Sequence, residues 1–118
     1  MFEVDELKEK KELLKRGLRL IPYCPVCVRP VLDMKKILEQ IKQGKGIRDA
    51  ILSQEGIASF GIFVPTSSEI LKLTGNKNVV YPVCVECEKD YISALKSGYV
   101  DESIITVLKL NLPSIRIR

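Results

Sequence analysis

The sequence predicts an α+β protein with a small sheet, three or four helices and two similar strand–C-x-x-C–helix corners that share one metal site. Segments with helical spacing of apolar residues alternate with short apolar runs rich in β-branched residues. Two C-x-x-C pairs, Cys24/Cys27 and Cys84/Cys87, each follow an apolar run. A chain of 118 residues with 46% hydrophobic and 29% charged residues fits one folded domain, 1–118.

The first part of the chain is predicted to hold a helix, a strand and a second helix. Apolar residues at helical spacing and i,i+4 charge pairs indicate a helix over 4–16, so that 1–17 forms an N-terminal helical segment. Residues 18–23 are expected to form a short buried strand that enters the first cysteine pair. A helix then begins at Pro30, which the first helical turn tolerates, and ends at Gly44. Its predicted apolar stripe is Val31, Met34, Leu38 and Ile41.

The middle of the chain, 45–78, is expected to be a segment inserted between the two cysteine pairs. Residues 47–54 form either a short helix or a strand, and the apolar spacing does not decide between them. Residues 57–64 read as a buried strand, in which Gly61 marks a kink or the close approach of another group.

A helix over 67–74 is favoured by a capping box formed by Thr66 and Glu69. The alternative is a strand that turns at 74–76. In either case, the apolar run at 79–83 forms a strand that leads into the second cysteine pair.

The last part of the chain is predicted to contain one helix and one edge strand. The helix spans 87–97, with Gly98 as its end, and completes a four-cysteine core over 18–98. Its predicted core face is Tyr91, Ile92 and Leu95. The tail, 99–118, is rich in β-branched residues and is expected to add an edge strand interrupted by Pro113.

The cysteines carry the clearest chemistry in the sequence. A C-x-x-C turn directs two sulfurs at one centre, and two such turns supply the four thiolates of a tetrahedral Zn²⁺ site. A helix N-terminus beside each pair would favour the thiolate form. The basic residues close to the pairs in sequence, which could offset the negative charge of the site, are Arg29, Lys35, Lys36 and Lys89. The predicted zinc ligands are Cys24, Cys27, Cys84 and Cys87.

Other uses of the same four sulfurs stay open at the level of sequence. An iron ion or an iron–sulfur cluster needs the same ligands. Two disulfides are a further alternative, because the composition, rich in lysine and isoleucine and without histidine, is thermophile-like. Some hyperthermophiles keep disulfides inside the cell.

On these residues the chain resembles four-cysteine proteins of the zinc-ribbon and treble-clef kind, in which one knuckle follows a strand and the second pair opens a helix. The resemblance covers residues 20–30 and 80–97 and implies a bound zinc ion. Many such knuckles carry glycine directly after the second cysteine, whereas this chain has Val28 and Glu88. The segment of 56 residues between the pairs is also longer than in a simple ribbon.

A second, weaker resemblance is to thioredoxin-like and glutaredoxin-like proteins. It rests on a strand, Cys24-Pro25-Val26-Cys27 and a long helix, and on the later phrase Phe60–Thr66. This resemblance implies a thiol–disulfide oxidoreductase in which Cys24 attacks and Cys27 resolves. Pro65 would be the counterpart of the proline that faces the redox pair.

Other enzyme chemistry is not expected. The chain has no histidine, so no Ser-His or Cys-His arrangement is available. It lacks the glycine-rich phosphate loops of nucleotide-binding enzymes. Four cysteine ligands would also close the coordination position that a hydrolytic zinc centre leaves open.

The remaining prediction is a binding role. The net charge of +4 allows a polyanionic partner, either a nucleic acid or, through an adaptor surface, a protein of a nucleic-acid-handling complex. The candidate contacts are Arg29, Lys35, Lys36, Lys42, Lys45, Arg48, Arg116 and Arg118. The charged N-terminus, without the apolar region of a secretory signal, and the lack of an apolar run of about 20 residues predict a cytoplasmic protein without membrane contact.

Overall fold

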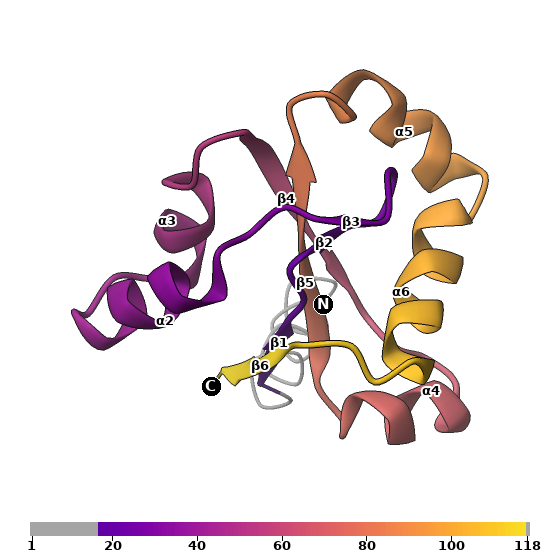
Figure 1. Ribbon diagram of the computed structural model, residues 1–118. Helices are drawn as coiled ribbons and strands as arrows, with labels where there is room; N and C mark the ends of the chain where they lie inside the picture. The colour runs from indigo at the N-terminus through magenta and orange to yellow at the C-terminus, as the bar shows by residue number, and fades with distance from the viewer. Residues whose placement is uncertain (1–16, 118) are drawn as a thin grey trace, which may run out of the picture.

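The computed structural model describes residues 17–117, and within this range the predicted α+β class is confirmed (Figure 1). The strands are β1 (Leu18–Leu20), β2 (Tyr23–Cys24), β3 (Arg29–Pro30), β4 (Ile57–Phe63), β5 (Asn78–Cys84) and β6 (Ile115–Ile117). The helices are α2 (Met34–Lys42), α3 (Ile47–Leu52), α4 (Ser68–Thr74), α5 (Glu88–Lys96) and α6 (Tyr99–Lys109). The helix predicted over 4–16 and the candidate contact Arg118 lie outside the described residues.

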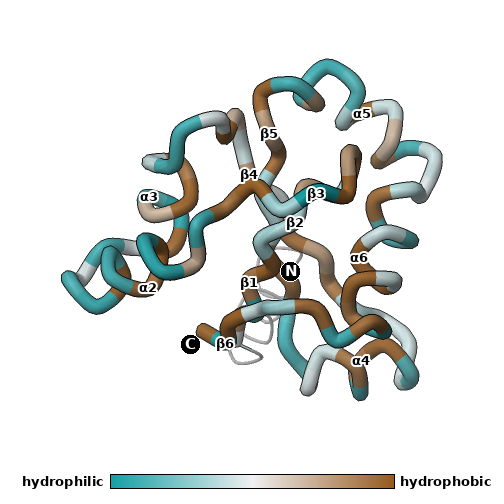
Figure 2. Tube along the Cα trace, viewed as in Figure 1, coloured by the Kyte–Doolittle hydropathy of each residue, from teal (hydrophilic) through white to brown (hydrophobic). Residues whose placement is uncertain are grey.

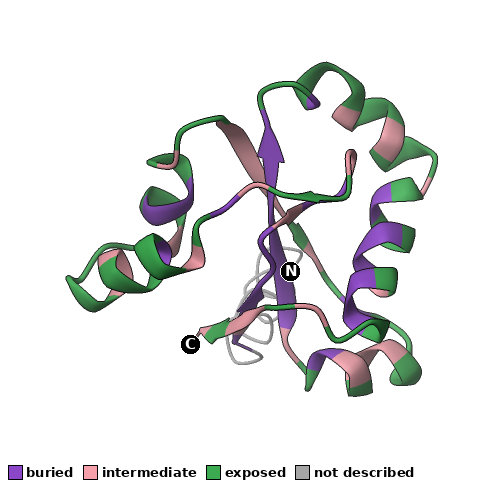
Figure 3. Ribbon diagram, viewed as in Figure 1, coloured by how far each residue is buried: buried purple, intermediate pink, exposed green. Residues whose placement is uncertain are grey.

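Four strands form a mixed sheet in the order β4-β5-β1-β6, while β2 and β3 form a separate hairpin. The two central strands, β1 and β5, run parallel. Both outer pairings, β4 with β5 and β1 with β6, are antiparallel. Since β5 has neighbours on both edges and helices on both faces, all seven of its residues are buried (Figure 3).

Helices cover both faces of the sheet, which gives a three-layer arrangement with two cores (Figures 1 and 2). On one face, alternate residues of β5 pack against α6 and its neighbours. This core contains Ile21, Val79, Tyr81, Val83, Val100, Ile104, Val107 and Leu108. On the other face, β1 and β5 pack against α2 and α3. That core contains Leu20, Leu32, Ile37, Ala50, Ile51 and Val80.

Helix α6 corrects the prediction of a C-terminal strand. The β-branched residues of the tail favoured a strand by propensity, but the buried positions recur at intervals of three and four residues. These positions are Val100, Ser103, Ile104, Val107 and Leu108. A helical stripe of this kind buries one continuous face, and tertiary packing overrides the weak strand propensity of isoleucine and valine. Only β6, after Pro113, keeps the predicted extended form.

The predicted helices at 30–44 and 87–97 form, but with other starts or other inward faces. α2 begins after Asp33, whose carboxylate accepts the backbone N–H groups of Lys35 and Lys36 at 3.1 and 3.4 Å, so Pro30 belongs to β3 and not to the helix. Ile37 is its fully buried residue, whereas Leu38 is exposed.

In α5 the residues that pack on the core are Tyr91 and Ala94. Ile92 and Leu95, predicted to face inward, are exposed. Because α6 starts directly after Gly98 and covers the same face of the sheet, α5 packs over the end of that face with only one side of the helix.

The segment 45–78 forms α3, β4 and α4, which decides the open choices for 47–54 and 67–74 in favour of helices. Ser67, not Thr66, caps α4, since its hydroxyl accepts the N–H of Ile70 at 3.3 Å. The strand predicted over 57–64 is β4, and its pairing with β5 makes the segment an integral part of the sheet.

The close approach predicted at Gly61 is confirmed. Gly61 pairs with Tyr81 across the β4–β5 ladder, and the aromatic ring lies over the glycine. The Tyr81 hydroxyl shares a hydrogen bond of 2.7 Å with the hydroxyl of Tyr91 on α5. The two rings meet edge to face with their centroids 6.2 Å apart. Gly61 therefore gives room to a tyrosine pair that ties β4, β5 and α5 together.

Within residues 17–117, no helix is both long enough and apolar enough to cross a membrane.

Candidate metal centre

The register of β1 and β5 brings the two cysteine pairs together. Leu18 pairs with Asn78 and Leu20 with Val80, so partners in this parallel ladder are sixty residues apart in the chain. The same offset of sixty separates Cys24 from Cys84 and Cys27 from Cys87. Since parallel strands end at the same edge of a sheet, both pairs leave that edge at the same height.

The first pair lies in the hairpin formed by β2 and β3. Cys24 is the last residue of β2 and pairs with Arg29 of β3. The turn closes through a 2.7 Å hydrogen bond from the N–H of Val28 to the carbonyl of Cys24. The structure therefore corrects the expectation that this pair leads directly into a helix, because β3 comes first and α2 starts only at Met34.

The second pair lies between β5 and α5, as predicted. Cys84 ends β5, and Cys87 occupies the N-cap position of α5. The N–H of Cys87 donates to the carbonyl of Cys84 at 3.1 Å, and the N–H of Tyr91 donates to the carbonyl of Cys87 at 2.9 Å. Only this pair has the positive end of a helix dipole beside it.

The four sulfurs form a compact set. All four Sγ atoms lie within 4.8 Å of one another, and the Sγ atoms of Cys27 and Cys84 are 4.0 Å apart. A tetrahedral ion with metal–sulfur bonds of about 2.3 Å needs sulfurs about 3.8 Å apart. To reach this spacing, the distances between the sulfurs would have to shorten by less than the length of one metal–sulfur bond. The four cysteines therefore lie close enough to bind a single metal.

The site is mostly buried. Cys24 is 0%, Cys84 6% and Cys87 8% exposed, and Val26 and Val31 pack around them. Burial is the main cause that raises the pKa of Cys84 and of Cys87. Buried thiolates this close together repel one another, so a bound cation is what would stabilise the deprotonated set.

Cys27 is the most accessible of the four and has a different environment. Burial tends to raise its pKa, but hydrogen bonds with the guanidinium and the backbone N–H of Arg29, and then with Cys24 and Cys87, outweigh this effect and hold the pKa at about 7. Arg29 also donates to Glu86, with Nη2 3.1 Å from Oε2. It thus connects the first knuckle to the Val85-Glu86 turn of the second. Glu86 carried no signal in the sequence, because this contact depends on the pairing of distant segments.

A shallow groove of about 290 Å³ borders the cysteines. It is lined by Arg29, Pro30, Val31, Glu55, Gly56, Cys84, Val85 and Glu86. Arg29 and Glu86, which both line the groove, form an ion pair with well-exposed side chains. An exposed pair of this kind contributes little to stability by itself.

The turn of the first knuckle holds Val28 in an unfavourable backbone conformation. Its φ of +53° lies in the left-handed region, where a β-branched residue is strained by about 1–2 kcal/mol. The chain therefore retains strain in the loop that positions Cys27 and Arg29.

We expect Val28→Gly to raise the free energy of unfolding by about 1 kcal/mol, because glycine adopts this φ without strain and Val28 is 39% exposed. Thermal unfolding of the purified protein measures the change. Val26→Gly in the same turn is the matched control and should be destabilising, because Val26 has no positive φ and packs on the cysteines. A Val28→Gly protein less stable than the parent would contradict the strain.

The other residues predicted for function lie in separate places. Five basic candidates lie on the α2–α3 helix pair, all exposed: Lys35, Lys36, Lys42, Lys45 and Arg48. Arg29 lies beside the metal centre, and Arg116 lies on β6. Pro65 follows β4 at the end where Phe63 pairs with Val79, whereas Ile57 at the other end pairs with Cys84. The structure therefore does not bring Pro65 to the Cys24/Cys27 pair.

Comparisons of this chain with protein-family models, with curated proteins and with solved structures found no match.

Proposed function

We propose that this chain is a small zinc-binding module in which one Zn²⁺ joins two cysteine knuckles, and that the module binds a nucleic acid or a protein of a nucleic-acid-handling complex. The observation that carries the zinc assignment is the set of four Sγ atoms within 4.8 Å of one another. Zinc accepts four thiolates in closed structural sites.

The sulfur spacing supports one ion over a cluster. In a cluster with several irons, different cysteines bind different irons, and the sulfurs are spread more widely than around a single ion. Tetrahedral four-sulfur sites are typical of zinc or of iron. Zinc is colourless and silent to redox titration, whereas a single iron in the same site absorbs visible light, so elemental analysis with a visible spectrum separates the two.

The burial of the site supports a structural role for the metal. Cys24 has no exposed surface, and all four coordination positions would be filled by protein. A catalytic zinc keeps one position for water or substrate. The activity of the module is therefore assigned to its surface.

The exposed basic residues of α2 and α3 support a polyanionic partner. Within the described range, the only ion pair is Arg29–Glu86, so the lysines of the α2–α3 pair have no acidic partner there. Such side chains are available to neutralise phosphates and to release counterions.

The binding proposal is tested with a fluorescent single-stranded oligonucleotide over a range of salt. We expect affinity to fall steeply with salt, and the double substitution Lys36→Ala/Lys42→Ala to reduce the log–log slope by about 1.4, because each single-strand phosphate contact contributes about 0.7. The matched control, Lys89→Ala/Lys96→Ala on α5, removes the same charge and should change the slope less.

Wild-type protein that does not bind, or equal losses in both double variants, would count against a nucleic-acid surface on α2–α3. The proposed partner would then be a protein of a nucleic-acid-handling complex, with the module acting as an adaptor.

A thiol–disulfide oxidoreductase is the second candidate, and the environment of Cys27 favours it. A partly exposed thiol whose pKa is held at about 7 by Arg29 is suited to nucleophilic attack. In this reading Cys27 attacks, in place of Cys24, which is fully buried. Insulin reduction by metal-free protein, lost in Cys27→Ser, would support it, and full zinc occupancy with no such activity would exclude it.

A further inference from the structure

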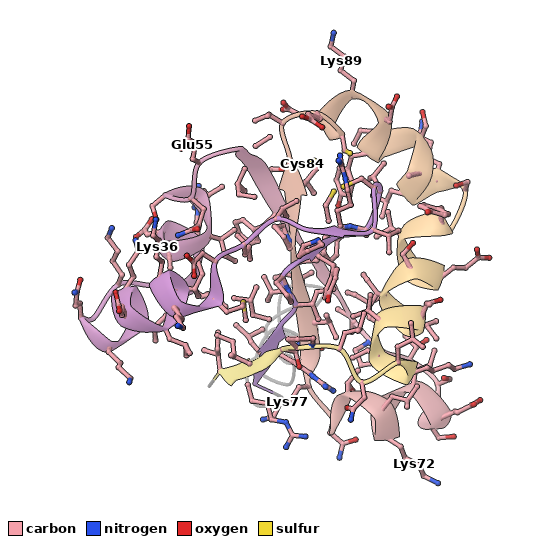
Figure 4. All side chains as sticks on the ribbon, in the orientation of Figure 1. Lys36, Glu55, Lys72, Lys77, Cys84 and Lys89 are labelled. Carbon is pink, nitrogen blue, oxygen red and sulfur yellow. The ribbon has the colours of Figure 1, made fainter. Side chains whose placement is uncertain are left out.

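A second charged site lies at the end of the sheet away from the cysteines. Figure 4 shows Lys77 at this end, and Cys84 and Lys89 toward the other. The β1–β6 ladder pairs Arg19 directly with Arg116, and Lys77 immediately precedes β5, the other neighbour of β1. Three cations from three segments of the chain are therefore gathered at one end of the sheet.

Arg19 is the built part of this site. Its side chain is buried, with 8% exposure, and it makes two hydrogen bonds. Nε donates to the Ser114 hydroxyl at 2.9 Å, and Nη1 donates to the carbonyl of Leu73, near the end of α4, at 2.8 Å. A guanidinium has five N–H donors, so these two bonds fix its orientation and leave others for a ligand.

The charge of Arg19 has no carboxylate partner in the described part of the chain. Burying a charge is costly unless an opposite charge compensates it. Here the cross-strand neighbour is Arg116, and like charges directly opposite each other in a ladder are destabilising. Burial and the proximity of Arg116 both lower the pKa of Arg19. The arrangement therefore places two positive charges side by side on one face of the sheet.

The cationic groups of Lys77 and Arg116 each lie next to a glycine, Gly17 and Gly75 respectively. The Nζ of Lys77 lies 3.3 Å from the position that a Cβ of Gly17 would take. An Nη2 of Arg116 lies 4.0 Å from the corresponding position at Gly75. Both glycines have positive φ, a conformation that favours glycine, and neither adds a side chain of its own beside the cationic groups. The backbone at Gly17 and Gly75 therefore leaves room next to Lys77 and Arg116 for a small anion.

We propose that Arg19, Lys77 and Arg116 form a binding site for a phosphate group. Guanidinium and ammonium groups donate charge-assisted hydrogen bonds to phosphate oxygens. The site is separate from the zinc centre and from the lysines of α2 and α3. The phosphate belongs either to a nucleic-acid backbone or to a free phosphate compound. In the first case the site deepens the proposed function and rests on it.

The test follows the backbone amide signals of zinc-loaded protein by NMR during titration with inorganic phosphate at constant ionic strength, with chloride as the reference anion. We expect saturable shifts at Arg19, Lys77 and Arg116. Lys77→Ala and Arg116→Ala should each weaken binding by about tenfold or more, because each removes one charge-assisted hydrogen bond to the phosphate. Lys89→Ala, which removes the same charge at the other end of the molecule, should leave the affinity within about twofold.

A second arm uses a single-stranded oligonucleotide with the same variants. If both phosphate and oligonucleotide binding weaken in Lys77→Ala and Arg116→Ala, the source is a nucleic-acid backbone. If only phosphate binding weakens, the site holds a free phosphate compound, and the site stands whatever happens to the nucleic-acid proposal. Shifts that chloride reproduces, or equal losses in the Lys89→Ala control, would overturn the site even if the oligonucleotide binds through α2 and α3.

Discussion

Cys24→Ser is expected to abolish stoichiometric zinc binding and to lower the stability of the protein by about 4 kcal/mol. A ligand present at about 1,000 times its dissociation constant stabilises the folded state by about this amount. For a domain of this size, the loss corresponds to a fall in the thermal midpoint of about 15 °C or more. Cys24 is the cysteine chosen for substitution because it is fully buried. Solvent water therefore cannot reach the metal to take the place of the missing thiolate.

The measurement combines zinc content by mass spectrometry with thermal unfolding. Wild-type protein treated with a chelator should unfold near the temperature of the variant, and added zinc should raise the midpoint of the wild type only. This return of stability is the control for damage caused by the substitution itself. A variant that keeps one zinc per chain and its full midpoint would contradict the four-cysteine site.

Gly61→Ala is expected to destabilise the fold by about 3 kcal/mol. A Cβ at this position would clash with the ring of Tyr81, which is only 3% exposed. The ring cannot swing away freely, because its hydroxyl is held by Tyr91 at 2.7 Å. Overpacking in a rigid core of this kind costs typically about 1–3 kcal/mol, and the lost tyrosine pair adds to it.

A double-mutant cycle identifies the cause of this effect. In a Tyr81→Ala background the ring is gone, and Gly61→Ala should then cost less than about 1 kcal/mol, giving a coupling energy of about 2 kcal/mol. Urea unfolding of the four proteins measures the cycle. Equal costs in both backgrounds would show that the conformational freedom of Gly61, and not its contact with Tyr81, is what the strand needs.

The convergence of the four cysteines could be predicted from sequence because its pattern is local. Each C-x-x-C pair is visible in four residues, and the sixty-residue offset of the pairs is present in the printed chain. The conformation of the first knuckle is harder to predict from sequence. The sequence placed a helix directly after it, whereas Arg29 and Pro30 pair back onto Tyr23 and Cys24.

The features that could not be predicted depend on contacts between distant segments. The β-branched residues of the tail predict a strand, and only packing against the sheet makes the helical stripe of α6 the better arrangement. The grouping of Arg19 with Arg116 has the same origin. In the sequence Arg116 shows only its charge, and the β1–β6 ladder is what places it opposite Arg19.

The parallel pairing of β1 and β5 has a consequence for how the protein assembles. Each knuckle alone offers an ion only two ligands, and the other two arrive when the long crossover between the strands has closed. Closing a loop of this length has an entropic cost that local contacts cannot offset, and parallel pairing is intrinsically slow to form. A metal bound by both knuckles would therefore act as a reversible cross-link over the crossover. Release of such an ion should speed unfolding more than it slows the early steps of folding, and the lifetime of the folded protein would then depend on the supply of metal.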